Sequence, residues 1–272
     1  MTAIEAIKKG FILAKDLISL MIIVLVFNFA SAMIMLAVIG INPTQEEVAT
    51  KVGPILFLSA AIMMVWVLLE GGIFSSIHSR LSSNQLGLES FAGNCFKFFG
   101  RLLGLNFLSG AIVFVLWIFG AFFTGLFVAM GQAKNPFFNA IGIIFMAIAV
   151  ICSFCVSIPM LIGQYILVAS NGKIMASLKR SFTLFRANIG RILFLFFLLI
   201  LIFFMISFLT NVIGILAGKI LPAGWILGIL NTIITSVVNG AYGIFASCTI
   251  LGLILSLDTP AIKQQAEGSP QA

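Results

Sequence analysis

The sequence predicts an all-α, polytopic integral membrane protein with six transmembrane helices. Of its 272 residues, 61% are hydrophobic and 8% are charged, whereas an ordinary soluble domain carries about 25% charged residues. Phe outnumbers Tyr by 28 to 2, as is typical of aromatic side chains that meet lipid or a core. The apolar runs are much longer than the roughly 10 residues of a barrel strand, which favours helices. Soluble enzymes, nucleic-acid-binding proteins and disulfide-stabilised scaffolds are excluded by this composition.

Six apolar segments reach the length of about 20 residues that a helix needs to cross a bilayer. These segments are 17–39, 54–74, 102–130, 137–162, 192–217 and 225–257. The third and the sixth are longer than a perpendicular crossing requires, so they must tilt, kink or project from the bilayer. We take residues 1–257 as a single membrane domain and the polar residues 258–272 as a C-terminal tail.

The distribution of Lys and Arg predicts that both termini face the cytoplasm, because cytoplasmic loops carry an excess of basic residues. Twelve fall on the side of the N-terminus: Lys8, Lys9, Lys15, Arg80, Lys97, Arg101, Lys173, Lys179, Arg180, Arg186, Arg191 and Lys263. The other side holds three, which are Lys51, Lys134 and Lys219. We expect the cytoplasmic (inner) membrane of a prokaryote.

Two basic connections have the period of amphipathic helices that lie in the membrane interface. In 171–191 the apolar residues Ile174, Leu178, Phe182, Phe185 and Ile189 share one face, and Lys173, Lys179, Arg180 and Arg186 share the other. The N-terminal stretch repeats the arrangement, with Ile4, Ile7, Phe11 and Ala14 against Lys8, Lys9 and Lys15.

These stretches also match each other in sequence. Residues 6–15, AIKKGFILAK, align without gaps to 177–186, SLKRSFTLFR, and a weaker copy lies at 90–99, SFAGNCFKFF. We therefore expect three cytoplasmic interfacial helices and a threefold internal repeat, with units of about 1–74, 75–170 and 171–257. Two spans return the chain to its starting side, so the repeats are parallel.

Segment 163–202, GQYILVASNGKIMASLKRSFTLFRANIGRILFLFFLLILI, joins two spans through such a basic stretch, and 96–110, FKFFGRLLGLNFLSG, takes the matching earlier place. In this pattern the chain resembles six-helix membrane proteins of bacteria and archaea, namely the membrane domain associated with glycerophosphodiester phosphodiesterases and its free-standing relatives. The resemblance implies a six-helix membrane fold. Because the soluble catalytic barrel of those phosphodiesterases is missing from these 272 residues, the resemblance implies no catalytic residue.

Few residues are candidates for catalysis. Asp16 and Asp258, the two aspartates, stand at span ends, and the single histidine, His78, lies in a Ser-rich connection. Cys152 and Cys155 form a C-x-x-C within a span, without a histidine or a second pair nearby, and we interpret them as buried small apolar residues. No nucleotide-binding or metalloprotease motif is present. We expect no enzymatic activity, no metal and no cofactor.

Glu70 is the one carboxylate within the predicted spans, about 24 Å along its helix and near the cytoplasmic boundary. We favour an interfacial or salt-bridged glutamate ahead of Gly71 and Gly72, which we expect to be flexible. The alternative is a proton or cation site.

A stripe of polar residues, defined as Asn231, Thr235, Asn239 and Tyr242, follows spacings of 4, 4 and 3 along the last span. Interhelical hydrogen bonding is the ordinary use of such residues in lipid. The alternative is a path for a polar ligand, or a surface for a partner.

We expect a non-catalytic scaffold, assembly factor or accessory subunit of a membrane complex. Its basic rim would contact anionic lipid headgroups or a protein partner in the membrane, and nucleic acid is not expected as a partner. The rim consists of Lys8, Lys9, Lys15, Lys179, Arg180 and Arg186. The alternative is a transporter of a lipid or small amphiphile. The two functions differ in whether the polar stripe lines a continuous cavity or packs shut.

Overall fold

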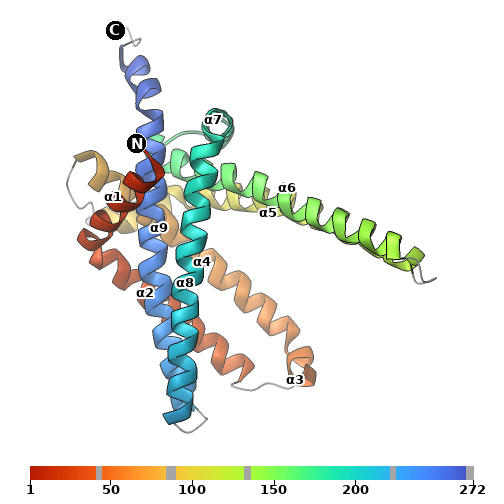
Figure 1. Ribbon diagram of the computed structural model, residues 1–272. Coiled ribbons are helices and arrows are strands. Elements are labelled where there is room, and N and C mark those ends of the chain that lie inside the picture. The colour runs from red at the N-terminus through yellow and green to blue at the C-terminus, as the bar shows by residue number, and fades with distance from the viewer. Residues whose placement is uncertain (41–44, 84–89, 132–135, 221–224, 268–272) are drawn as a thin grey trace. The chain divides into compact units, whose positions relative to one another are not determined.

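The structure is a computed structural model that describes residues 1–40, 45–83, 90–131, 136–220 and 225–267. Within these residues every regular element is a helix (Figure 1). The helices are α1 (Ala3–Asp16), α2 (Ile18–Ile39), α3 (Gln45–Thr50), α4 (Val52–Ser83), α5 (Phe91–Gly131), α6 (Pro136–Ser170), α7 (Ile174–Ala187), α8 (Ile189–Ile220) and α9 (Trp225–Glu267).

Six of these helices, α2, α4, α5, α6, α8 and α9, are long and apolar enough to cross a membrane. The prediction of six candidate spans is therefore confirmed. Several helices extend beyond the apolar runs that predicted them. For example, α6 continues from the predicted end at residue 162 to Ser170, and α9 continues into the polar tail as far as Glu267.

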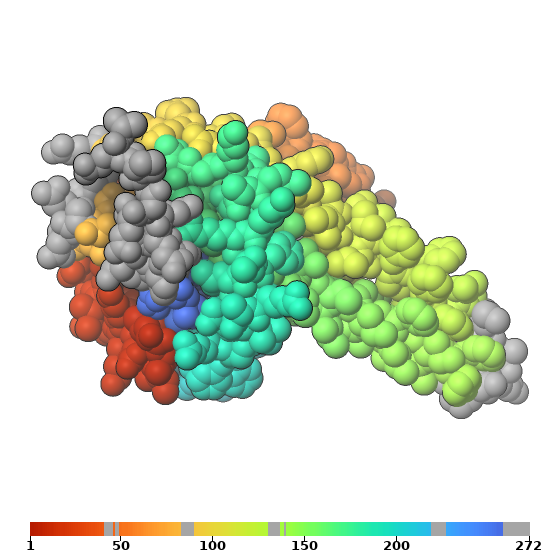
Figure 2. Space-filling view, turned by 90° about the horizontal axis from the view of Figure 1, so that it is seen from above, coloured from red at the N-terminus to blue at the C-terminus, as the bar shows by residue number. Residues whose placement is uncertain are grey.

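The chain forms two compact units. The first contains Met1–Cys95 and Asn188–Ala272, and α9 is its central helix, in contact with α1, α2, α4 and α8. Figure 1 shows α1 lying across α9, and Figure 2 shows the N-terminal residues, in red, on the surface beside the blue of α9. Leu20, Ile77, Leu195 and Leu251 are fully buried in this unit, so α2, α4, α8 and α9 all contribute to its core.

The second unit contains Phe96–Ala187, and thus most of α5 with α6 and α7. The α5 and α6 helices run side by side (Figure 1), and the rings of Phe123 and Phe127 stack on Phe145 at 5.0 and 5.4 Å. Near the connection to α7, Leu105, Met160 and Leu178 form a buried apolar cluster.

The two short helices α1 and α7 correspond residue by residue. Both have 14 residues, and each end of α7 lies 171 residues after the matching end of α1. The following spans α2 and α8 begin after one non-helical residue, Leu17 and Asn188. Four buried positions also match: Ala6 with Ser177, Gly10 with Ser181, Leu13 with Leu184 and Ala14 with Phe185.

The third stretch differs from the expectation of a separate interfacial helix. Residues 91–100 are the first turns of α5, which continues unbroken to Gly131. Cys95 and Phe98 are buried and Phe96 is 72% exposed. The positions of α1 with the same spacing are Gly10 and Leu13, which are buried, and Phe11, which is exposed. Residues 91–100 therefore share more of the burial pattern of α1 than residues 90–99 do.

Candidate functional site

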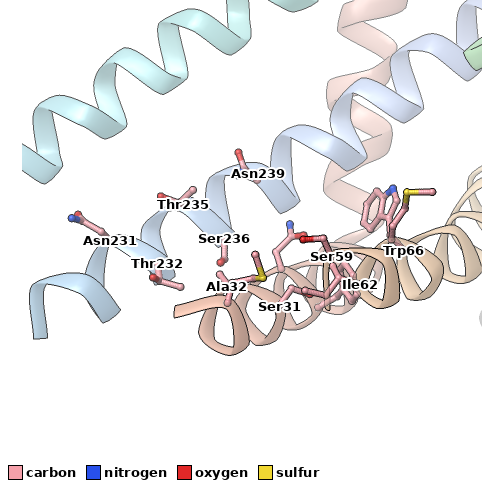
Figure 3. A pocket seen from close by; sticks show the side chains of 14 residues that line it. Ser31, Ala32, Ser59, Ile62, Trp66, Asn231, Thr232, Thr235, Ser236 and Asn239 are labelled. Carbon is pink, nitrogen blue, oxygen red and sulfur yellow. The ribbon is translucent and has the colours of Figure 1, made fainter. Parts of the chain in front are cut away.

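Most of the polar stripe lines a cavity of about 670 Å³ between α2, α4 and α9. Asn231, Thr235 and Asn239 belong to the lining, and Tyr242 does not. The residues that line the cavity with them are Phe27, Asn28, Ser31, Ala32, Met35, Ser59, Ile62, Met63, Trp66, Thr232 and Ser236 (Figure 3).

The spacing of residues on α9 produces two polar faces within this cavity. Residues four apart lie on one side of a helix, so Asn231, Thr235 and Asn239 form a row, and Thr232 and Ser236 form a second row about 100° around the axis. In Figure 3 Thr232 and Ser236 point toward α2, and Thr235 and Asn239 point away from it. The three residues of the first row are exposed, whereas Ser236 is buried.

Helices α2 and α4 contribute both polar and apolar groups. Asn28 and Ser31 come from α2 and Ser59 from α4. Between these two helices the rings of Phe27 and Trp66 lie 5.6 Å apart and tilted by 32°. The cavity thus has polar groups from all three helices and an aromatic surface between α2 and α4.

A close crossing of α2 and α9 lies next to the cavity. Gly240 is buried, and a methyl group at this position would lie 3.4 Å from the backbone nitrogen of Leu25. The added methyl group would be in van der Waals contact with the backbone of α2, so a small residue at this position favours the close approach of the two helices. The cavity-lining residues of α9 come before Gly240 and those of α2 come after Leu25, so the cavity lies on one side of the crossing.

None of the described side chains that line the cavity is charged. Its hydrogen-bonding groups are amides and hydroxyls, which act as both donors and acceptors. Such a lining suits a neutral polar group, with Phe27, Ile62, Met63 and Trp66 available to an attached apolar group. The lining of the cavity is therefore suited to binding an amphiphile.

Tyr242 is the residue of the polar stripe that lies apart from the cavity. Its hydroxyl donates a hydrogen bond to the carbonyl oxygen of Leu199 on α8, 2.9 Å away, and its ring lies 5.3 Å from that of Phe203. Helix α8 covers this part of α9, and the long tyrosine side chain reaches a carbonyl there. Tyr242 therefore has the ordinary interhelical role, and the stripe is divided between two functions.

Glu70 is also separate from the cavity. It is half-buried inside α4, which continues 13 residues further to Ser83. Gly71 and Gly72 belong to the same helix, and Gly72 is packed against the side chains of Phe91 and Cys95. The expectation that this glycine pair is flexible is wrong, because Gly72 provides the close approach for the start of α5.

The residues of the basic rim occupy matching positions on two helices. Lys8, Lys9 and Lys15 are exposed on α1, Lys179 and Arg186 are exposed on α7, and Arg180 is half-buried. The ammonium group of Lys15 lies 4.8 Å from the ring centre of Phe11. The rim is not part of the cavity lining.

No set of three or more His, Cys, Asp or Glu side chains within the described ranges is grouped so that it could hold a metal ion. Cys152 and Cys155 differ in burial, since the first is half-buried and the second is exposed.

Five polar residues of the cavity, Asn28, Ser31, Ser59, Thr232 and Ser236, were not among the predicted site residues. Thr232 and Ser236 each follow a residue of the stripe by one position, which is a signal available in the sequence. The residues that α2 and α4 contribute to the cavity depend on how these helices cross α9. The periodicity of a single span carries no information about that crossing.

Comparison of the chain with protein-family models, with curated proteins and with solved structures gives no match. The resemblance to the phosphodiesterase-associated membrane domain therefore rests on the sequence pattern alone, which includes residues 96–110 and 163–202.

Proposed function

We propose that this is a non-catalytic, multi-pass membrane protein that binds a lipid or small amphiphile in the cavity between α2, α4 and α9 and carries it within the bilayer. The observation that supports the proposal is the neutral polar lining of Asn28, Asn231, Thr235 and Asn239 next to the apolar surface of Trp66. The volume of about 670 Å³ is within the range of roughly 300–1,000 Å³ of small-molecule sites.

The energetics of polar groups in a membrane favour a bound partner. A buried amide or hydroxyl without a hydrogen bond in an apolar medium costs a few kcal/mol. Asn231, Thr235 and Asn239 are exposed at the surface of their unit, in a helix apolar enough to span the bilayer. A ligand with a polar group, or water that enters with it, would supply the missing hydrogen bonds.

The test is lipid movement in vesicles that contain the full chain. The probe is a phosphatidylethanolamine with a fluorescent headgroup, whose exposure in the outer leaflet is read by chemical quenching. We expect faster exchange between leaflets than in protein-free vesicles, and a loss of most of this gain in the double variant Asn28→Leu/Asn239→Leu, which keeps the branched shape of the side chains and removes the amides.

A matched control is Asn211→Leu. Asn211 is an exposed residue of α8 whose amide donates to the carbonyl oxygen of Ser207 in its own helix, 2.9 Å away, and it does not line the cavity. Exchange no faster than in protein-free vesicles, or equal effects of Asn28→Leu/Asn239→Leu and Asn211→Leu, would contradict the proposal.

A second candidate function is that of a scaffold, assembly factor or accessory subunit whose basic rim contacts anionic lipid or a protein partner. It is favoured by the exposure of Lys8, Lys15, Lys179 and Arg186 at matching positions of α1 and α7. The triple variant Lys179→Gln/Arg180→Gln/Arg186→Gln should then lose co-purified anionic lipid or partner while its topology is kept by the other basic residues. If the amounts of co-purified lipid and partner were unchanged in this variant, the basic rim would serve only as a topology signal.

Two structural proposals accompany these functions. The charge distribution supports a location in the inner membrane of a prokaryote with both termini in the cytoplasm. The matching ends and buried positions of α1 and α7, and the burial pattern that residues 91–100 share with α1, support a threefold parallel repeat.

A further inference from the structure

A second groove lies between α1, α8 and α9, with a volume of about 820 Å³. It differs from the cavity of the polar stripe because its surface is almost wholly apolar. Apart from two lysines, its lining consists of Ile7, Phe11, Ile12, Ala14, Met21, Ile202, Ile206, Val237, Val238, Ala241, Tyr242 and Phe245.

The two lysines, Lys8 and Lys15, are the charged residues of this lining. They are seven residues apart, so they lie on the same side of α1 and about 10 Å apart along its axis. Lys15 extends over the ring of Phe11, with its ammonium group 4.8 Å from the ring centre. Lys8 interacts electrostatically with Glu5, but neither lysine forms an ion pair within 4.0 Å of another described residue.

The groove extends from these lysines along α9. Its lining residues on α9 run from Phe245 to Val237, which is a length of about 12 Å along that helix. The order is therefore a pair of positive charges at α1, followed by an apolar channel between α8 and α9. A phospholipid has the same order, with an anionic phosphate followed by an acyl chain.

We propose that this groove binds one anionic phospholipid, with its phosphate held by Lys8 and Lys15 and an acyl chain lying along α9. The site rests on the lipid contact suggested above for the basic rim, and it narrows that contact to two of the six rim residues. Charge complementarity selects the occupant: an anionic phospholipid brings a net negative charge to the two ammonium groups, whereas in a zwitterionic phospholipid the positive headgroup offsets the phosphate.

Lys9 provides a matched control on the same helix. It is exposed like Lys8, but its side chain is about 100° further around α1 and is absent from the lining of the groove. A general attraction of α1 to an anionic surface would use Lys9 as well as Lys8. A lipid site in the groove would not.

The experiment is native mass spectrometry of the full chain released from micelles that contain either phosphatidylglycerol or phosphatidylcholine. We expect one phosphatidylglycerol retained per chain, and roughly 30-fold weaker retention in Lys8→Gln/Lys15→Gln, from the contribution of two basic residues to binding an anionic surface. Lys9→Gln should retain phosphatidylglycerol like the unchanged protein, and phosphatidylcholine should bind weakly throughout.

A second pair of variants tests the apolar part. Ala241→Phe places a ring in the groove and should reduce retention without any change in charge, whereas Ala60→Phe, at an exposed position of α4 outside the groove, should not. Equal retention by Lys8→Gln/Lys15→Gln and Lys9→Gln would overturn the site. Loss of lipid in the triple variant Lys179→Gln/Arg180→Gln/Arg186→Gln alone would support lipid binding by the basic rim and contradict the groove site. Loss of lipid in none of the variants would contradict both proposals.

Discussion

Gly10 determines how closely α1 can approach α9. A methyl group at this position would lie 2.9 Å from the Cα atom of Thr249, a distance that requires the helices to move apart. The surrounding face of α1 is made of small residues, Ala3, Ala6 and Ala14, all of them buried. Close contact between small residues is a main source of helix association in membranes.

We therefore predict that Gly10→Ala destabilises the protein by about 1–3 kcal/mol, as is typical of overpacked sites. The control is Gly243→Ala on α9, where no atom lies within 4 Å of the added methyl group. This control should be neutral or slightly stabilising, because Ala favours helix. The measurement is thermal unfolding in detergent, followed by the reaction of the buried thiols of Cys95 and Cys248 with a fluorescent reagent. Equal melting curves for both variants would contradict the close contact.

At the level of single residues, the sequence was sufficient for part of the candidate site. The spacing of Asn231, Thr235 and Asn239 predicted a shared face, and these residues do line one cavity. The spacing could not show that Tyr242 lies outside the cavity. Its role depends on the length of its side chain and on the nearby carbonyl of Leu199. Ser59 could not be predicted either, since its membership depends on the packing of α4.

At the level of elements, the start of α1 has an electrostatic stabilisation that depends on pH. Thr2 and Glu5 form a capping box, in which the Thr2 backbone amide donates to the Glu5 carboxylate at 2.7 Å and the Glu5 amide donates to the Thr2 hydroxyl at 3.3 Å. The hydrogen bond from the Thr2 backbone is the main cause that lowers the pKa of Glu5.

A carboxylate whose pKa is lowered on folding stabilises the folded state above its unfolded pKa, which is about 4.3 for Glu. That contribution is lost as the pH falls through the lower pKa of the folded state. We predict that α1 frays below about pH 4.3, and that Glu5→Gln removes this dependence. Hydrogen exchange of the α1 amides as a function of pH measures it. A pH dependence that is unchanged in Glu5→Gln would assign the effect to another group.

The connection between α6 and α7 is fixed by Arg101. Asn171 has a positive φ of 49°, and the amides of Asn171 and Gly172 donate to the carbonyls of Val168 and Leu167, as in a Schellman motif. The guanidinium of Arg101 donates to the carbonyl oxygens of Asn171 and Gly172 and to the Asn171 side chain, at 3.1–3.2 Å. A single side chain thus binds three acceptors at the end of α6.

We predict that Arg101→Lys, which keeps the charge but loses the planar geometry, loosens this connection. Hydrogen bonds to charged groups contribute about 1.5–3 kcal/mol, so hydrogen exchange at residues 171–177 should accelerate by roughly 10- to 100-fold. Arg191→Lys, at an exposed position of α8, should leave this exchange unchanged. No acceleration in Arg101→Lys would show that the backbone bonds alone hold the turn.

Helical periodicity predicted α1 and α7 closely, since both have a basic face and clear ends. It failed for the third stretch, where residues 91–100 belong to the long helix α5. The sequence alignment of the three stretches relied on their charged residues. The feature that α1, the start of α5 and α7 share in the structure is a small buried residue, which is Gly10, Cys95 and Ser181 respectively. Gly72 receives Cys95, and Gly163 contacts Ser181 in the same way.

At the level of the whole molecule, the unequal distribution of twelve and three basic residues predicts the topology. Lys134, which lies outside the described residues, and Lys219 belong to the side with few charges, and Lys179 belongs to the other. We predict that Lys134→Cys and Lys219→Cys react with a membrane-impermeant thiol reagent added to intact cells. Lys179→Cys should react only when the cytoplasmic side is opened. If Lys134→Cys reacted only from the cytoplasmic side, the predicted topology would be wrong.

The packing of α1 on α9 also sets an order for synthesis. Gly10 leaves the ribosome 239 residues before its neighbour Thr249, and at about 5–20 residues per second this interval is roughly 12–48 s. During that time α1 has no α9 to receive its small-residue face, and its exposed Ile4, Phe11 and Ile12 can rest on the membrane surface. Helix α1 is therefore synthesised early but is among the last helices to reach its final contacts. In a chain whose synthesis stops before α9, α1 remains undocked, and quality-control proteases can distinguish such a chain from the finished protein.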